Sequence, residues 1–140
     1  MHDAAGLEIL SRTECLRLLS KVPIGRLAVT DRGLPVIHPV NFVLDGECIV
    51  FRTSAANKLA AATQDAVVAF EADDFDVRRR SGWSVMVTGR AATVTDPDTL
   101  VRLRTLRLHP WVPNRPERYV QVSLDLVTGR RVPESEAEPG

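Results

Sequence analysis

The longest regular pattern in this sequence is an alternation of side chains between residues 82 and 94. Trp83, Val85 and Val87 alternate there with Ser84 and Thr88. A repeat of two residues is the period of a β-strand, whereas an amphipathic helix repeats about every 3.6 residues. The segment 82–94 is therefore predicted to be one long strand, and the shorter runs around it decide the fold class.

Five further runs are predicted to be strands, and they cover residues 24–30, 36–44, 47–52, 66–71 and 118–127. Asp45-Gly46 lies between two of them, and Asp-Gly favours a hairpin because a type I′ turn needs positive φ at both central positions. Pro35 and Pro39 lack an N–H group, so each is expected at a sheet edge, a bulge or a strand end. Together the six strands predict a mainly β (α+β) fold built on a closed or partly closed antiparallel barrel, with a β-sandwich as the alternative.

Short helices are predicted between the strands. Ser11 and Glu14 form a capping box before a helix over 12–20. An alanine-rich helix is predicted over 54–63, with Ser54 as its N-cap. Asp96-Pro97 begins a third helix that extends to about residue 108. Residues 73–81, which include the run Arg78–Arg80, are predicted to form a charged loop.

Length and charge limit the organisation and the partners of the chain. Its 140 residues fit one domain over 11–132, preceded by a flexible segment over 1–10 and followed by a disordered acidic tail over 133–140. Lys plus Arg equals Asp plus Glu at 18 each, so no overall field favours nucleic acid or an anionic membrane. No apolar run is long enough to span a membrane and no signal peptide is evident, so a cytoplasmic location is expected. Cys15 and Cys48 lack a metal-binding spacing and are predicted to be buried thiols, and no metal site is expected.

The segment from Arg52 to Lys58 has the composition of an anion site. A predicted strand ends and a predicted helix begins there, and Thr53 and Ser54 add hydroxyl groups to the two cations. Guanidinium, ammonium and hydroxyl donors together suit a phosphate monoester. From spacing alone, a capped helix with two solvated cations is the favoured alternative.

The order of these features resembles the pyridoxamine 5′-phosphate oxidase-like, FMN-binding split-barrel proteins. The chain looks closest to the actinobacterial branch that also contains deazaflavin-dependent reductases. The resemblance is carried by residues 24–28, 38–42, 51–59, 67–71 and 82–91, in this order and with these spacings. It implies a six-stranded split barrel with two or three short flanking helices, and a homodimer with cofactor sites in the subunit interface. Nothing after Arg118 matches the oxidase's own substrate-binding segment, so vitamin B6 oxidation is not expected.

The resemblance also implies roles for ten residues. The segment that holds the flavin phosphate in such proteins matches Arg52, Thr53, Ser54, Asn57 and Lys58. The segment that runs along the flavin ring matches His38, Pro39, Val40 and Asn41, and Trp83 lies on a strand that helps to wall the site. No catalytic acid or base is identified.

Three functions remain open at this point. The first is an FMN- or deazaflavin-dependent oxidoreductase acting on a small organic substrate. The second is a non-catalytic protein that binds or sequesters flavin, deazaflavin or haem. The third, a nucleic-acid-binding barrel, is disfavoured by the zero net charge. FMN is the expected cofactor; F-420 would need extra cations such as Arg26 and Arg78–Arg80, and haem would need His38 or His109 as a ligand.

Overall fold

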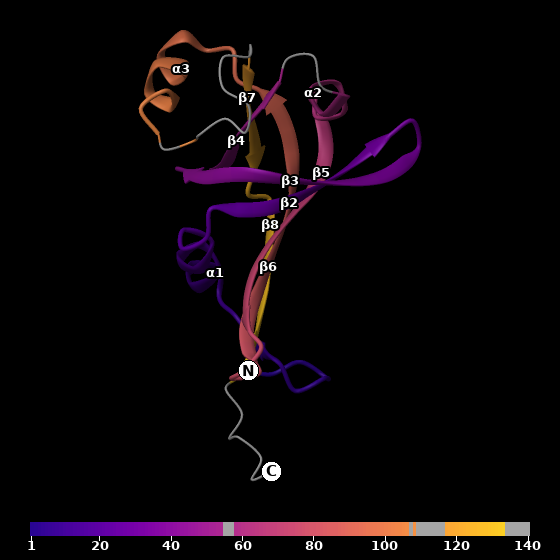
Figure 1. The fold of residues 1–140 in the computed structure, drawn as a ribbon, viewed down its shortest axis with the longest axis vertical. Coiled ribbons are helices and arrows are strands. Elements are labelled where there is room, and N and C mark those ends of the chain that lie inside the picture. The colour runs from indigo at the N-terminus through magenta and orange to yellow at the C-terminus, as the bar shows by residue number, and fades with distance from the viewer. Residues whose placement is uncertain (55–57, 107, 109–116, 134–140) are drawn as a thin grey trace.

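The computed structural model describes residues 1–54, 58–106, 108 and 117–133, and within them it contains eight strands and three helices. Figure 1 shows their arrangement. In chain order they are β1 (Glu8–Ile9), α1 (Arg12–Leu19), β2 (Ile24–Asp31), β3 (Leu34–Asp45), β4 (Cys48–Ser54), α2 (Lys58–Ala62), β5 (Ala66–Asp76), β6 (Ser81–Thr93), α3 (Pro97–Leu103), β7 (Glu117–Ser123) and β8 (Leu126–Val132).

Six of the strands close into an antiparallel barrel. Neighbours follow the order β6-β5-β2-β3-β4-β7, and β7 returns to β6 through pairs such as Ala92 with Gln121. These six strands correspond to the six runs predicted from the sequence, so the predicted mainly β barrel is confirmed. The structure adds β8, which pairs with β6, and the short β1, which pairs with β8.

The sixth predicted strand, 118–127, is wrong as a single element. β7 ends at Ser123 and β8 begins at Leu126, so two residues separate two different strands. Both strands pair with β6, β7 along residues 91–93 and β8 along residues 82–88. Between Ser123 and Leu126 the chain therefore passes from one segment of β6 to the next. The side chains alternate without a break through this point, so the sequence pattern does not reveal the division into two strands.

The hairpin turns confirm the predicted pairing and correct its details. Asp31 pairs with Leu34, and Arg32 and Gly33 both have positive φ, as a type I′ turn requires. In the next hairpin Asp45 pairs with Cys48, so the central residues are Gly46 and Glu47 rather than Asp45 and Gly46. Only Gly46 has positive φ, which is the pattern of a type II′ turn.

The predicted charged loop over 73–81 is also wrong in extent. β5 continues to Asp76 and β6 begins at Ser81, so only residues 77–80 form the turn. The carboxylate of Asp76 accepts hydrogen bonds from the backbone N–H groups of Arg78 and Arg79, and Arg80 adopts a positive φ. These local bonds allow charged residues to form a tight hairpin.

The helices agree with the sequence at their starts and differ in length. Ser11 and Asp96 accept backbone N–H groups as the N-caps of α1 and α3, as predicted. α3 ends at Leu103, several residues earlier than expected. Ser54 ends β4 and α2 is described from Lys58 onward, so the predicted N-cap role of Ser54 stays a prediction. Residues 55–57 lie outside the described part of the chain.

The hydrophobic core fills the barrel and extends under α1. Phe42 and Phe70 meet edge to face inside it, with ring centroids 4.7 Å apart. A second cluster lies outside the barrel beneath α3 and contains Val50, Val94, Leu103, Leu108 and Tyr119. β4 is therefore covered on both faces, which explains why it is apolar at consecutive positions.

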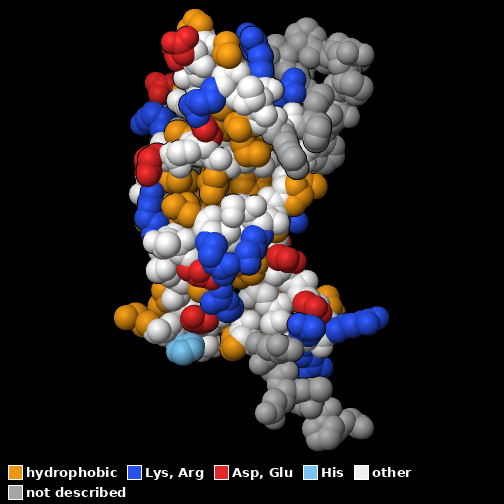
Figure 2. Space-filling model, turned by 90° about the vertical axis from the view of Figure 1, so that its left-hand side faces the viewer, with side chains coloured by type: hydrophobic (Ala, Val, Ile, Leu, Met, Phe, Trp, Pro, Cys, Tyr) orange, Lys and Arg blue, Asp and Glu red, His pale blue; other side chains and the backbone are white. Residues whose placement is uncertain are grey.

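The side of the molecule that carries α1 and α3 is shown in Figure 2, where hydrophobic side chains gather across the middle between charged ends. Of the two free thiols, Cys15 is buried as predicted, whereas Cys48 is only half-buried. Among the described residues, no group of three or more His, Cys, Asp or Glu side chains could hold a metal ion. In the same part of the chain, no helix is long and apolar enough to cross a membrane.

Candidate cofactor site

The barrel opens where β3 separates from β4. β3 pairs with β2 from Leu34 to Asn41. Among the described residues it pairs with β4 only from Phe42 to Asp45. The first two-thirds of β3 thus have β2 on one side and no described strand on the other.

The backbone of β3 presents polar groups along that second side. The Phe42 N–H donates to the Pro23 carbonyl oxygen at 3.1 Å, so even-numbered residues of β3 point their backbone groups toward β2. Backbone direction alternates along a strand in an antiparallel ladder, so the N–H groups of Ile37 and Asn41 point the opposite way. Pro35 and Pro39 occupy the remaining donor positions on this edge, which confirms their predicted edge placement.

Side chains of the predicted site fall on two faces of β3 and β4. Val40 and Thr53 face the barrel interior and are only 5% and 6% exposed. His38 lies on that same face of β3 and is half-buried. Pro39 and Asn41 face outward on β3. Arg52 and Ser54 face outward on β4, with Ser54 at its end.

Asn41 and Arg52 lie on either side of the opening. Phe42 pairs with Phe51, so Asn41 and Arg52 are the next residues on each strand, at the point where the strands diverge. Lys58 begins α2, which follows β4 after three residues that lie outside the described part of the chain, Asn57 among them. Trp83 is buried in the core at the far end of β6, about 30 Å along that strand from Thr93. Within one protomer, Trp83 and Arg52 do not share a site.

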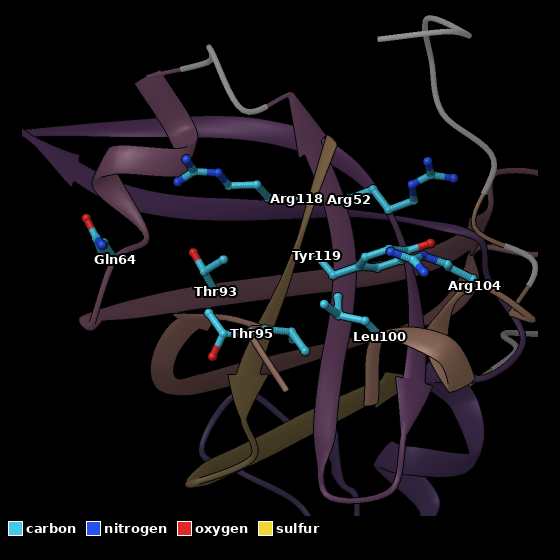
Figure 3. Close-up of a pocket in the computed structure, with 9 residues that line it drawn as sticks. Arg52, Gln64, Thr93, Thr95, Leu100, Arg104, Arg118 and Tyr119 are labelled. Atoms are coloured by element: carbon cyan, nitrogen blue, oxygen red, sulfur yellow. The ribbon is translucent and has the colours of Figure 1, made fainter. Parts of the chain in front are cut away.

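A cavity of about 760 Å³ lies beside Arg52, around the ends of β4, β6 and β7 and next to the helix α3. Figure 3 shows the residues that line it, among them Arg52, Thr93, Leu100, Arg104, Arg118 and Tyr119. Of these residues, only Arg52 was predicted from the sequence. The pairing of β4 with β7 brings Arg118 and Tyr119 close to Arg52, which lies opposite Tyr119. Thr93 ends β6, and Leu100 and Arg104 come from α3 and its C-cap.

Arg52 is held in a defined position in this cavity. Its Nη1 donates to the Leu108 carbonyl oxygen at 2.9 Å, and its guanidinium carbon lies 5.3 Å from the centroid of the Tyr119 ring. A guanidinium over an aromatic face at this distance makes a cation–π interaction. The arrangement presents a fixed positive charge to the cavity.

A second polar cluster lies on the outer face of β2 and β5. Arg26 contacts Glu71 at 3.2 Å and Asp73 at 3.5 Å. Burial and the neighbouring Asp73 raise the pKa of Glu71 to about 7, although Arg26 acts in the opposite direction. The cluster borders a hollow of about 300 Å³ that is otherwise apolar.

The remaining candidates lie apart from these sites. Arg78–Arg80 form the turn between β5 and β6, and Arg79 is within 4.0 Å of Asp76. His109, considered as a haem ligand, lies outside the described residues.

Comparison with known proteins defines the class of this barrel. The model of the pyridoxamine 5′-phosphate oxidase family matches residues 11–131, and the chain belongs to that family. The predicted resemblance is therefore confirmed.

Three proteins similar to this chain come from mycobacteria. The chain is 44% identical to the uncharacterized protein Rv0080 of Mycobacterium tuberculosis over 129 residues, which are 88% of this chain and 84% of that protein. Among solved structures, the FAD binding protein from Mycobacterium smegmatis has a TM-score of 0.80 and 40% identity over 90% of this chain and 100% of its own. The FAD and heme binding protein from the same organism shares the fold, with a TM-score of 0.72 at 16% identity over 91% of this chain and 75% of its own.

Proposed function

We propose that this protein binds a flavin at the opening between β3 and β4 and works as an oxidoreductase on a small organic substrate. The observation that carries the proposal is the edge of β3, where the backbone N–H of Ile37 points away from β2 and no described strand pairs with residues 34–41 on that side. A flat heterocycle with donors and acceptors on its rim fits such an edge, and a phosphate fits the cations that follow. Membership of the family supports the same assignment.

The chain's own residues would bind and orient the cofactor. A bound flavin would supply the redox chemistry, with hydride passing through N5, or through C5 in a deazaflavin. The β3 edge would fix the ring, and Arg52 and Lys58 would neutralise the phosphate. The interior side of the opening is apolar at Val40, which would keep water from the ring.

A flavin-binding protein without turnover is the second candidate. It is favoured by one specific observation, that the similar protein from Mycobacterium smegmatis is described by what it binds, FAD, and not by a reaction. Measuring whether a reduced flavin on the protein is reoxidised faster by a small organic acceptor than by oxygen would separate the two candidates. FMN, F-420 and haem stay as cofactor predictions from the sequence, as does a cytoplasmic location.

We also propose that the protein is a homodimer. A row of outward-facing residues crosses five strands through paired positions and consists of Ile37, Ala28, Ala69, Thr88 and Leu126. Ile37 is 69% exposed and Leu126 is 59% exposed. A nearly apolar row of this kind on a sheet face is typical of a protein interface. In a dimer, residues such as Trp83 that lie far from Arg52 in one protomer could approach the other protomer's site.

Titration of the purified protein with FMN, FAD, F-420 and haem, followed by absorbance and fluorescence, tests flavin binding. Saturable binding of a flavin at one per subunit is the expected result. Binding of haem alone, or of none of the four, would contradict the proposal.

Lys58→Ala tests the phosphate assignment in the same assay. Loss of a hydrogen bond to a charged group should weaken flavin binding by about 1.5–3 kcal/mol while leaving folding nearly intact. Lys21→Ala removes the other lysine of the chain, two residues after the end of α1, and should leave binding unchanged. Equal dissociation constants for the wild type and Lys58→Ala would show that Lys58 does not hold the phosphate.

A further inference from the structure

Three charged side chains lie together on the sheet face that carries the row from Ile37 to Leu126. The Arg26 guanidinium is 3.2 Å from the Glu71 carboxylate and 3.5 Å from that of Asp73. All three are partly shielded from water, since the exposed fractions of their side chains are 50%, 37% and 27% in that order. One cation therefore serves two acids, and the cluster carries a net charge of −1 when both acids are ionised.

The cluster borders the row directly. Arg26 and Glu71 lie opposite each other on β2 and β5, two residues along each strand from Ala28 and Ala69, which belong to the row. The same two charged residues line the hollow of about 300 Å³, together with Met86 of β6. A molecule that covers the row would therefore cover the Glu71 carboxylate as well.

The other cations at strand positions of this face, within the described residues, already contact a carboxylate. β6 contributes Arg90, which is 3.4 Å from Asp65, and β8 contributes Arg130, which is 3.1 Å from Asp3. The outward side chains of β3 are not titratable: Pro35, Ile37, Pro39 and Asn41. Apart from Arg26, the face therefore holds no cation that lacks a carboxylate of its own.

The shape of this face suits a second copy of the chain. Leu126 is 59% exposed at one end of the row, and the hollow lies toward the other end, beside Ile37. In a two-fold symmetric dimer the same face meets itself, so each protomer offers the other both an exposed apolar side chain and a hollow. Because the cations of this face already have carboxylate partners, a second copy covers Glu71 without neutralising it.

We propose that the Arg26–Glu71–Asp73 cluster makes dimerisation proton-dependent, because the second protomer covers Glu71 and the covered carboxylate takes up a proton. The inference rests on the proposed dimer and adds to it the group that controls its strength. A carboxylate that loses water without gaining a cation favours its protonated form.

The direction of the pH dependence follows from this burial. In the single chain, burial and the neighbouring Asp73 already raise the pKa of Glu71 to about 7. Further burial in the dimer raises this pKa above its value in the single chain, so the dimer holds the proton more tightly. The contribution of this proton to dimer stability is therefore full below about pH 7 and is lost as the pH rises through the higher pKa of the dimer.

Sedimentation of the full chain at several pH values and constant ionic strength tests the inference. The dimer dissociation constant of the wild type should rise by about tenfold or more between pH 6 and pH 8, because dissociation releases up to two protons, one from each protomer. Glu71→Gln keeps the shape of the protonated carboxyl and has no proton to release. Its dissociation constant should be nearly independent of pH and, at pH 8, lower than that of the wild type.

Glu47→Gln is the matched control, because it makes the same chemical change at the β3–β4 turn, where the side chain is 89% exposed. It should follow the wild-type curve. Histidine also titrates in this pH range, so a pH dependence that persists in Glu71→Gln would overturn the assignment to Glu71. A wild-type dissociation constant that stays constant, or that falls as the pH rises, would overturn the inference while the proposed dimer stands. A wild type that is monomeric at every pH would contradict the proposed dimer and the inference together.

Discussion

At the scale of single residues, the pKa of Glu71 is raised into the pH range where proteins are usually handled. Its carboxyl lies on the outer face of β5, partly desolvated and beside Asp73, with Arg26 shared between the two acids. One guanidinium cannot fully compensate two neighbouring carboxylates. The pKa of Glu71 therefore rises from 4.5 to about 7.

This shift predicts a pH dependence of stability. The folded protein holds the Glu71 proton more tightly than the unfolded chain, so the contribution of this group is full below pH 4.5 and is lost as the pH rises toward 7. The Glu71 side chain is 37% exposed, so solvent screening should keep the loss below about 1 kcal/mol. Urea unfolding of the wild type across this range should show a steeper decline than unfolding of Glu71→Gln.

Glu47→Gln provides the control for this measurement, because the Glu47 side chain is 89% exposed. Its stability should follow the wild-type curve. Identical slopes for Glu71→Gln and the wild type would mean that Glu71 titrates alike in the folded and unfolded chains.

The sequence predicted which types of residue form the site, but not the direction in which their side chains point. Arg52 and Thr53 were both assigned to the phosphate, yet adjacent residues of a strand face opposite sides, and Thr53 is buried in the barrel. The alternation itself could have shown this. Arg104 and Arg118 could not have been found, because no local pattern in the sequence specifies the tertiary arrangement that places them near Arg52. Arg118 lies on β7, which pairs with β4, and Arg104 is the C-cap of α3.

At the scale of elements, Gly89 marks the point on β6 where one partner strand replaces another. β8 pairs with β6 up to Thr88, and β7 pairs with it from Ala91. A Cβ atom at position 89 would overlap the backbone carbonyl of Ser123, the last residue of β7. The glycine therefore allows the backbones to approach closely where the chain changes position.

Gly89→Ala should destabilise the fold by about 3 kcal/mol, because neither strand can move without breaking its pairing. The free energy of unfolding from urea titration measures the effect. Adding Ser123→Ala should not restore stability, since the clash is with the backbone oxygen and not with the hydroxyl. Full rescue by that second change, or an undiminished stability in Gly89→Ala alone, would contradict the proposed close approach.

The elements themselves were largely predictable, because period-two alternation and turn residues are local properties. α1 and its cap follow from Ser11 and Glu14, and the β3–β4 hairpin follows from the position of Gly46. The predicted strand bounds are wrong where the alternating pattern continues although the strand pairing changes. The run 118–127 alternates throughout, and only the tertiary pairing with β6 divides it into β7 and β8.

At the scale of the whole molecule, the barrel has one sheet face that no helix in the described part of the chain covers. The row from Ile37 to Leu126 crosses β3, β2, β5, β6 and β8, and the Arg26 cluster lies in the next row. Hydrophobic patterning predicted the strands but could not predict this face, because alternation shows that a residue points outward without showing what covers it.

Ile37→Lys tests whether a second copy of the chain covers this face. Ile37 is 69% exposed in the single chain, so lysine there should leave the fold intact while it places an unpaired charge in the proposed interface. The wild type should sediment as a dimer of two 15.4 kDa chains, and the variant's dimer dissociation constant should rise by about 100-fold or more. Val101→Lys, at a 61% exposed position on α3, makes the same kind of change away from this face and should remain dimeric. A monomeric wild type would rule out the dimer, and loss of the dimer in both variants would place the interface elsewhere than on this row.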